Sequence, residues 1–435
     1  MNIAGSYQSM FRIPELKRRI LFTAMILLVY RLGGHIPTPG IDRAALAAFF
    51  DAQSGSLMGL YDMFSGGNLR NATIFALGIM PYISASIIFQ LLQAVVPYFE
   101  KLAKEGEEGR KKITQFTRYG TVVLAMIQSF GMAAGLEGMA GGIVQTPGLP
   151  FKLLTALTLT AGTIFVMWLG EQITERGIGN GISLIIFIGI VARYPTDILN
   201  TGQQLASGDM HIVKALLIAV FMLFVIAGII AITQGQRKIP VQYAKKIVGR
   251  RVYGGANTHI PLKVNTAGVI PIIFAQSIIM FPGTLGAIFP DNSFFLTLSA
   301  LFRPPHVVYV LSYSSLIILF AYFYTAVILN PVDLADNMKK NSGFIPGVRP
   351  GKKTAEYIDR VLTRVTLPGA VFLAAIAILP DLMISLLQVP FYFGGTGLLI
   401  VVGVALDTLQ QIESHLVMRH YDGFMSKGRV RSGRR

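Results

Sequence analysis

The residue types that most often carry enzyme chemistry are sparse in this chain, and their spacing groups none of them into a site. Cysteine is absent, so the sequence offers no disulfide framework and no thiolate metal site. The six histidines have no metal-ligand spacing and no HExxH motif is present; they are His35, His211, His259, His306, His415 and His420. We therefore predict no catalytic residue, no metal site and no cofactor, and the chain is not expected to be an enzyme.

Three closely spaced glycines are the nearest approach to a phosphate-binding loop. Gly177, Gly179 and Gly181 follow an apolar stretch, but no Gly-Lys-Ser/Thr sequence comes after them, so a P-loop is not indicated. The alternative, a tight turn between two helices, explains them better. Any energy drawn from a nucleotide must then come from a partner.

The elements that would position any site are membrane helices. Of the 435 residues, 53% are hydrophobic and 14% are charged, whereas a soluble domain has about 25% charged residues. Each crossing of a bilayer needs about 20 apolar residues. Ten stretches fit, and these are residues 20–36, 72–96, 119–136, 153–170, 181–192, 212–233, 267–288, 307–329, 365–387 and 393–412.

The distribution of Lys and Arg predicts the orientation of these stretches. If the amino terminus lies inside, the inner segments hold 31 of the 38 basic residues, which is the bias expected of cytoplasmic loops. Both termini are then cytoplasmic. Five spans precede the outer segment 193–211 and five follow it, so the two halves enter the membrane from opposite sides, an arrangement that commonly encloses a path at the interface.

Three segments between the spans stand out. Residues 55–71 are rich in glycine, half apolar and too short to cross, which is tolerated at membrane depth only inside protein or beside a water-filled cavity. The loops 234–266 and 330–364 are long and basic. They are either ordinary positive loops near anionic lipid or docking surfaces for a large anionic partner, and their length favours docking.

Ionisable residues within the spans separate two classes of transport protein. A secondary transporter of small solutes usually needs a carboxylate near the middle of the membrane to bind the coupled ion. The nearest candidates, Glu171 and Asp407, lie toward the ends of spans, where structural roles are more common. A channel without ion coupling is therefore favoured, with the small-solute transporter as the alternative.

Long stretches of the chain resemble the SecY family, the central subunits of the bacterial Sec protein-conducting channel. The matching stretches are FSGGNLRNATIFALGIMPYISASIIFQLL (64–92), GEQITERGIGNGISLIIFIGIV (170–191), GQRKIPVQYAKK (235–246), GRRVYGGANTHIPLKVNTAGVIPIIFAQSI (249–278), FIPGVRPGKKTAEYIDRV (344–361) and FYFGGTGLLIVVGVALD (391–407). They follow one another in family order across nearly the whole chain. Such ordered matches are far more specific than a short motif.

The resemblance implies an all-α integral membrane protein of ten transmembrane helices, arranged as two inverted five-helix halves around a central hourglass pore. The expected parts are an N-terminal half (1–192), a hinge or external loop (193–211), a C-terminal half (212–412) and a basic cytoplasmic tail (413–435). Such a channel translocates unfolded secretory polypeptides and releases transmembrane segments laterally into lipid. The expected location is the bacterial cytoplasmic membrane.

The resemblance also assigns roles to individual residues. The pore ring is expected at Ile79, Ile83, Ile182, Ile186, Ile273 and Ile400. A plug is expected near 57–71, with Tyr61, Met63, Phe64, Ser65, Gly66, Gly67 and Asn68. Gln128 and Asn265 match polar positions of the lateral gate, and the basic loops offer Arg250, Arg251, Arg349 and Lys352 to a partner, with Arg250 and Arg251 as alternatives for one position.

The partners that the resemblance implies are the SecE and SecG subunits, the SecA motor ATPase, the ribosome, signal peptides with the nascent polypeptides that carry them, and membrane lipid. Energy would come from SecA or from the translating ribosome, because the chain has no nucleotide site of its own. An apolar pore ring offers no hydrogen bonds, so it sheds water and ions while closing around any extended chain.

Overall fold

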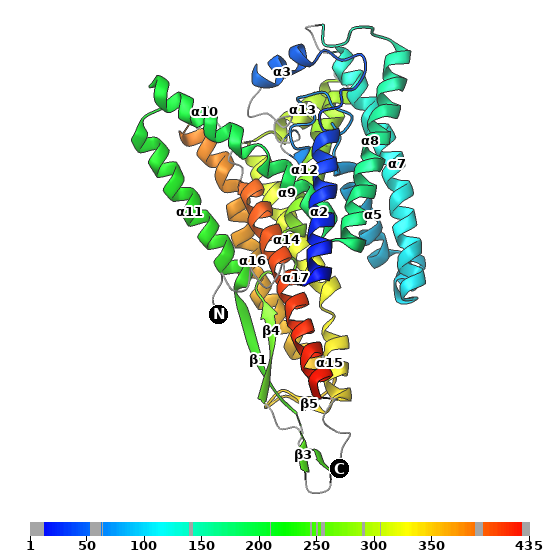
Figure 1. Cartoon of the computed structure of the whole chain (residues 1–435), viewed down its shortest axis with the longest axis vertical. Helices are drawn as coiled ribbons and strands as arrows, with labels where there is room; N and C mark the ends of the chain where they lie inside the picture. Colours follow the sequence, from blue (N-terminus) through cyan, green and yellow to red (C-terminus); the bar gives the residue numbers. More distant parts are fainter. Residues whose placement is uncertain are drawn as a thin grey trace. The chain divides into compact units, whose positions relative to one another are not determined.

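The computed structural model describes residues 13–52, 62, 64–138, 142–208, 210–243, 246–248, 251–253, 257–288, 292–304, 306–387 and 395–428. The chain divides into two compact units. One unit contains residues 1–203, 280–304 and 400–435, and the other contains residues 204–279 and 305–399. Each unit is helical, and the second also carries a small sheet (Figure 1).

The first unit is built from helices that cover most of the N-terminal part of the chain. They are α2 (Pro14–Gly33), α3 (Arg43–Ala52), α5 (Met80–Val95), α6 (Pro97–Lys104), α7 (Glu107–Gly138), α8 (Leu149–Arg176), α9 (Gly181–Val191) and most of α10 (Tyr194–Ser207). Two later helices, α13 (Ser293–Leu301) and most of α17 (Gly395–Gly428), belong to the same unit.

Close backbone approaches hold the helices of the first unit together. α7 and α8 run side by side (Figure 1), and Ser129 hydrogen-bonds Thr160 across them at 3.0 Å. Glycines let α8 approach its neighbours further, since a Cβ on Gly162 would collide with the Ile74 carbonyl and one on Gly181 with the Gly170 carbonyl. Small residues at such contacts are typical of helices packed within a membrane.

The second unit consists of α11 (Ile212–Gln234), α14 (Val307–Ile328), α15 (Pro331–Lys340), α16 (Lys352–Leu387) and most of α12 (Ile270–Ile288). α14 packs along α16, and the phenol of Tyr322 donates a hydrogen bond to the Thr363 carbonyl at 3.1 Å. The ring of Phe274 on α12 meets Phe320 on α14 edge to face, with centroids 5.7 Å apart.

A three-stranded antiparallel sheet joins the two basic loops of the second unit. Its strands are β1 (Gln236–Tyr243), β4 (Asn257–Lys263) and β5 (Gly343–Phe344) in the order β4-β1-β5, so one loop supplies two strands and the other supplies the third. A hairpin of β2 (Lys246–Val248) and β3 (Arg251–Tyr253) lies between β1 and β4 in sequence. The sheet buries one apolar cluster against α15 and α16: Ile239, Val241, Leu262, Met338, Ile345, Ile358 and Leu362.

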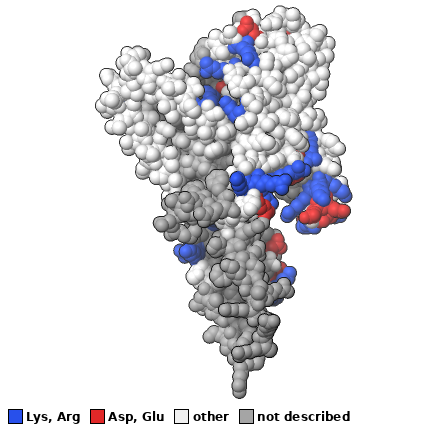
Figure 2. Space-filling view, viewed as in Figure 1, with Lys and Arg blue, Asp and Glu red and all other residues white. Residues whose placement is uncertain are grey.

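Seven helices or helix pairs in the described part of the chain are long and apolar enough to cross a membrane, and an eighth qualifies if the pair α5 and α6, bent by 96°, forms one span. The chain is therefore a mostly helical membrane protein. Large hydrophobic side chains such as Phe224 and Val213 on α11 stay exposed, as lipid-facing residues would. Figure 2 shows broad uncharged areas on the face in view, with charged side chains gathered in small groups.

The predicted spans agree with helix bounds where polar residues flank an apolar run. The stretch predicted at 181–192 forms α9 (Gly181–Val191), and the one predicted at 307–329 forms α14 (Val307–Ile328). The second stretch was predicted from residue 72, but its helix begins at Met80, because residues 65–79 are folded in turns. The ninth was predicted from residue 365, whereas α16 already begins at Lys352.

Candidate functional site

The described part of the predicted plug, residues 62 and 64–71, is called the plug segment below. Local backbone hydrogen bonds fold this segment into turns. The Gly67 amide donates to the Asp62 carbonyl at 2.8 Å, and the Thr73 amide donates to the Asn68 carbonyl at 3.0 Å. Gly66 and Gly67 have φ of 74° and 81°, a left-handed conformation that glycine adopts without strain. The consecutive glycines of the sequence therefore make a compact turn here.

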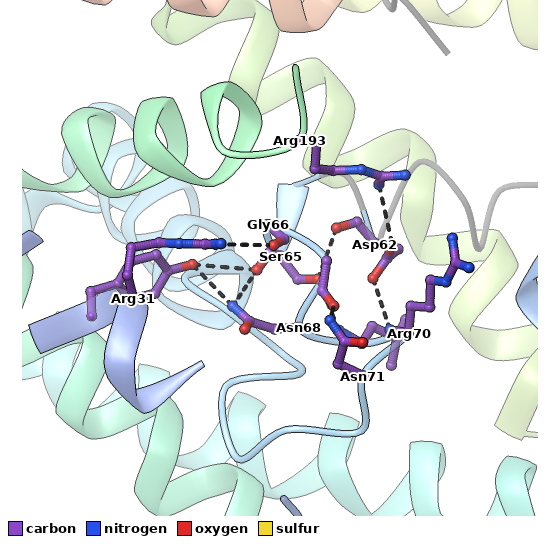
Figure 3. A network of polar contacts seen from close by, with 11 residues as sticks. Arg31, Asp62, Ser65, Gly66, Asn68, Arg70, Asn71 and Arg193 are labelled. Carbon is purple, nitrogen blue, oxygen red and sulfur yellow. Dashed lines mark hydrogen bonds and ion pairs between the residues drawn. The ribbon is translucent and has the colours of Figure 1, made fainter. Parts of the chain in front are cut away.

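Helix α2 anchors the plug segment through one buried phenol. Tyr30 is 2% exposed, and its ring stacks on Phe75 with centroids 5.8 Å apart. Its hydroxyl donates to the Ser65 carbonyl at 3.3 Å and accepts a hydrogen bond from the Asn68 amide at 3.2 Å (Figure 3). The Asn68 amide also donates to the Ser65 carbonyl, so Tyr30 adds a second hydrogen bond to each of two buried polar groups that already pair with each other.

The main chain of the plug segment also touches α2 and α9. The Arg31 guanidinium donates to the Gly66 carbonyl at 3.4 Å. On the other helix, a Cβ built on Gly66 would lie 2.8 Å from the Cα of Gly189. Glycine at both positions allows this backbone contact, and any side chain at Gly66 would separate the two elements.

An ion pair forms a third attachment of the plug segment. The Asp62 carboxylate lies 3.1 Å from the guanidinium of Arg193, which follows α9, and the Arg70 amide donates to the same carboxylate at 2.8 Å (Figure 3). The Asp62 side chain is 3% exposed and that of Arg193 is 30% exposed. Burial raises the pKa of the Asp62 carboxyl above its ordinary value, although Arg193 acts in the opposite direction.

The structure describes five of the seven residues predicted for the plug. Phe64, Ser65 and Asn68 are buried, at 3%, 0% and 3% exposed. Gly66 and Gly67 make the turn described above. Tyr61 and Met63 lie outside the described residues.

The six isoleucines predicted for the pore ring lie on or next to four elements. Ile79 immediately precedes α5 and Ile83 lies near its start, while Ile182 and Ile186 lie on α9, Ile273 on α12 and Ile400 on α17. Five are buried, and Ile182 is half-buried, with its side chain packed against Gly170 of α8. Ile273 belongs to the second unit and the others to the first. Their convergence on one axis stays a prediction.

The two predicted gate residues also lie in different units. Gln128 is half-buried on α7, and its side-chain oxygen has no hydrogen-bond partner among the described residues. Asn265 is 7% exposed, precedes α12 and donates from its side chain to the Gly268 carbonyl at 3.0 Å. Asn265 thus shapes the turn that starts α12.

The basic residues predicted to bind a partner belong to the second unit. Arg349 and Lys352 are exposed, just before and at the start of α16, and the Arg349 carbonyl accepts from the Thr354 hydroxyl at 2.9 Å. Arg251 begins β3, and Arg250 lies outside the described residues. Arg349 lies between β5 and α16, so the segment that carries it starts from the folded platform that the sheet makes of the two loops.

The glycine cluster at 177–181 is a turn, as predicted. Gly179 has a φ of 87°, and the Asn180 side chain caps α9 by accepting from the Ile182 and Ser183 amides. Glu171 pairs with Arg118 at 2.8 Å and joins α8 to α7, which confirms a structural role for this carboxylate.

The comparisons with known proteins agree on one family. The SecY family model matches residues 73–409, which is most of the chain. A curated relative from Escherichia coli (strain K12), protein translocase subunit SecY, is 51% identical over 422 residues that cover 96% of this chain and 95% of the relative. The chain belongs to the SecY family. The SecY of Aquifex aeolicus is 46% identical over 425 residues, covering 97% of this chain and 99% of that protein.

Solved structures of SecY-type channels share the fold. One described as a protein-conducting channel aligns with a TM-score of 0.65 at 17% identity, covering 92% of this chain and 93% of that chain. Another, on how the SecY plug domain stabilizes the closed state, aligns with a TM-score of 0.63 at 18% identity, covering 92% of each chain. At this identity the two structures support the fold of the chain and nothing finer.

Sequence reasoning missed Tyr30 and Arg193 as parts of the site, and it placed Asp62 within the predicted plug without giving it a role. Tyr30 lies in an ordinary apolar run, where nothing distinguishes it from a membrane-interface tyrosine. Asp62 and Arg193 carried a usable signal, because each is an isolated charge beside an apolar segment. A charge in such a place needs a partner, although 131 residues separate these two in sequence.

Proposed function

We propose that this SecY-family chain forms a channel that translocates unfolded secretory polypeptides and releases transmembrane segments laterally into lipid. The observation that carries the proposal furthest is the seating of the plug segment against α2 and α9 by Tyr30, Gly66 and the Asp62–Arg193 pair. A re-entrant segment held by several weak polar contacts can be displaced by a passing chain, and it returns when the chain has left. The name of the curated relatives, protein translocase subunit, supports the same reading.

The finer architecture of the proposal is ten transmembrane helices in two inverted five-helix halves around an hourglass pore. The halves are residues 1–192 and 212–412, with a hinge at 193–211 and a cytoplasmic tail at 413–435. The helices that fall short of a full apolar span, such as α2 and α12, would complete the ten. Both termini would face the cytoplasm, in the cytoplasmic membrane of a bacterium, because the Lys and Arg bias favours that orientation.

In this proposal the six isoleucines close the waist of the pore. Branched apolar side chains offer no hydrogen bonds to water or ions, yet they move aside for an extended polypeptide of any sequence. The lateral gate would involve Gln128 and Asn265. Polar contacts between membrane helices contribute only about 0.6 to 2 kcal/mol each, so a hydrophobic signal segment that gains lipid contact can open such a gate.

The energy source and the partners also belong to the proposal. The basic loops would receive the SecA motor ATPase or the ribosome through Arg349, Lys352 and either Arg250 or Arg251, and SecE and SecG would complete the channel. The sheet formed jointly by the two loops supports a docking role, because the exposed Arg349 and Lys352 follow its strand β5 closely in the chain. An ordinary lipid-facing loop does not need such a platform.

The proposal is tested by reconstitution. The chain is placed in proteoliposomes with SecE-like and SecG-like subunits, and SecA, ATP and an unfolded secretory precursor are added. Protection of the precursor from protease that depends on ATP is the expected result. A reconstituted, folded chain that gives no such protection, while a related translocase in the same vesicles does, would contradict it.

A further inference from the structure

An ion pair between Asp62 and Arg193 links the plug segment to the end of α9. Both residues lie within the first unit. Their side chains are 3.1 Å apart, although 131 positions separate them in the sequence. The two partners are unequal, because the Asp62 side chain is 3% exposed whereas that of Arg193 is 30% exposed. Losing the partner would therefore leave Asp62 as a buried charge, while Arg193 could turn to water.

We propose that Arg193 keeps the plug segment seated by compensating the buried charge of Asp62, so that movement of the α9–α10 junction ejects the plug. This inference rests on the proposed function, in which the plug is expected near residues 57–71. Arg193 is then a positioning residue: it touches no substrate and acts through Asp62. The pair couples the start of the proposed hinge, residues 193–211, to the release of the plug.

The physical basis is the asymmetry of buried ion pairs. Removing one partner from such a pair is strongly destabilising, because the remaining charge stays buried without compensation, whereas replacing both by neutral groups is often harmless. Asn at position 62 would keep an oxygen that accepts from the Arg70 amide, now 2.8 Å from the carboxylate. The two single substitutions are therefore expected to differ, although both break the same ion pair.

Burial of Asp62, which outweighs the positive charges around it, sets the sign of a pH effect. Arg193 faces it from the end of α9, Arg70 lies beside it in the plug segment, and Arg31 on α2 contacts the neighbouring Gly66 carbonyl. Burial raises the pKa of the Asp62 carboxyl. A carboxyl with a higher pKa when seated than when exposed binds protons more tightly when seated, so acid favours seating and rising pH weakens it.

The test uses the absence of cysteine from the natural chain. Ser65, which is 0% exposed, is replaced by Cys as a reporter in the full-length chain, held in phospholipid nanodiscs. The rate of labelling by a hydrophilic maleimide measures how often the plug segment leaves its seat. The backgrounds compared are the parent, R193Q, D62N and the double variant D62N/R193Q. R43Q is the control, because the Arg43 guanidinium donates to the His35 carbonyl at 2.9 Å and pairs with no carboxylate among the residues that the structure describes.

The expected order is specific to charge compensation. R193Q raises the labelling rate at least about tenfold, equivalent to about 1.4 kcal/mol at 25 °C, whereas D62N, D62N/R193Q and R43Q stay within about twofold of the parent. Lowering the pH from 8 to 5 slows labelling in R193Q relative to D62N, and taking that ratio removes the pH dependence of the thiol itself. Rescue of R193Q by D62N would establish that the unpaired carboxylate causes the release.

Other orders overturn the inference. Equal acceleration in D62N and R193Q would indicate an ordinary latch, and equal acceleration in R193Q and the double variant would indicate a structural role of Arg193 alone. If R193Q is labelled at the parent rate, Arg193 has no role in seating the plug segment. ATP-driven translocation by the same five proteins separates this result from the proposed function. Failed translocation with the expected labelling order would contradict the transport role only, and normal translocation with a different order would contradict the trigger only.

Discussion

Gly66 packs directly against Gly189, so that a Cβ added to Gly66 would lie 2.8 Å from the Cα of Gly189. Real Cβ atoms do not approach other heavy atoms so closely, and the contact therefore exists only because both residues lack a side chain. It joins the plug segment to α9, the helix that carries two of the predicted pore isoleucines. The seating of the plug can thus be tested by adding a single methyl group.

We expect Gly66→Ala to unseat the plug segment and to raise the resting ion conductance of the channel in planar bilayers. Gly67→Ala is a matched control, because its φ of 81° carries the same penalty of about 1 to 2 kcal/mol while the nearest atom lies 4.0 Å from the added Cβ. Equal conductance in the two variants would show that the backbone contact with Gly189 has no role in sealing.

Tyr30→Phe is expected to loosen the plug segment without disturbing the aromatic stack on Phe75. The change removes the hydroxyl from the Ser65 carbonyl and the Asn68 amide, which stay hydrogen-bonded to each other, so each lost bond should cost about 0.5 to 1.5 kcal/mol. A lower midpoint of thermal unfolding, measured together with faster labelling of Ser65→Cys, would support this. Tyr322→Phe loses one exposed hydrogen bond to Thr363 and should cost less; a larger loss there would contradict the ranking.

Replacing two ring isoleucines by glycine should make the resting channel leak. Ile83 and Ile186 are compared with Ile87 and Ile185, which lie on the same two helices and have the same exposure, 3% on α5 and 1% on α9. Both double variants lose the same packing volume and helix propensity. A leak confined to the Ile83/Ile186 variant is expected in conductance measurements, and similar leaks in both would refute a special role for the ring.

Arg349→Glu should impair ATP-driven translocation several-fold and change the thermal stability little. The residue is exposed on the platform formed by the two basic loops, where a reversed charge repels an anionic partner but disturbs few contacts of its own. Lys340→Glu, at the exposed end of α15, controls for net charge. Parallel losses of stability and translocation in the Arg349 variant would point to a structural role instead.

Hydropathy predicted the bounds of helices whose apolar residues are flanked by polar ones. It failed where part of a helix is itself polar. α11 and α14 lie within about a residue of their predicted bounds, whereas the first turns of α16 are charged and amphipathic and were assigned to a loop. The sheet that joins the two basic loops was not predicted, because Gln242 pairs with Phe344 across about 100 residues. Non-local pairing of short strands leaves little signal in the sequence.

The location of the glycine-rich segment could be predicted from the sequence, but the residues that contact it could not. The consecutive glycines in a segment too short to cross the membrane indicated an embedded turn, and Gly66 and Gly67 form it. The partners that hold this turn, Tyr30 and Arg193, come from helices far away in sequence. Their roles depend on packing, which residue types alone do not specify.

The central claim is that an unfolded polypeptide passes the isoleucines assigned to the waist. In the cysteine-free chain, Ile186→Cys and Ile185→Cys differ by one position on α9 at equal burial. A secretory precursor with one cysteine is stalled during ATP-driven translocation and oxidised, and disulfide formation is measured. The account predicts a cross-link to position 186 that requires ATP and is absent at position 185; equal cross-linking at both positions, or none at position 186, would contradict it.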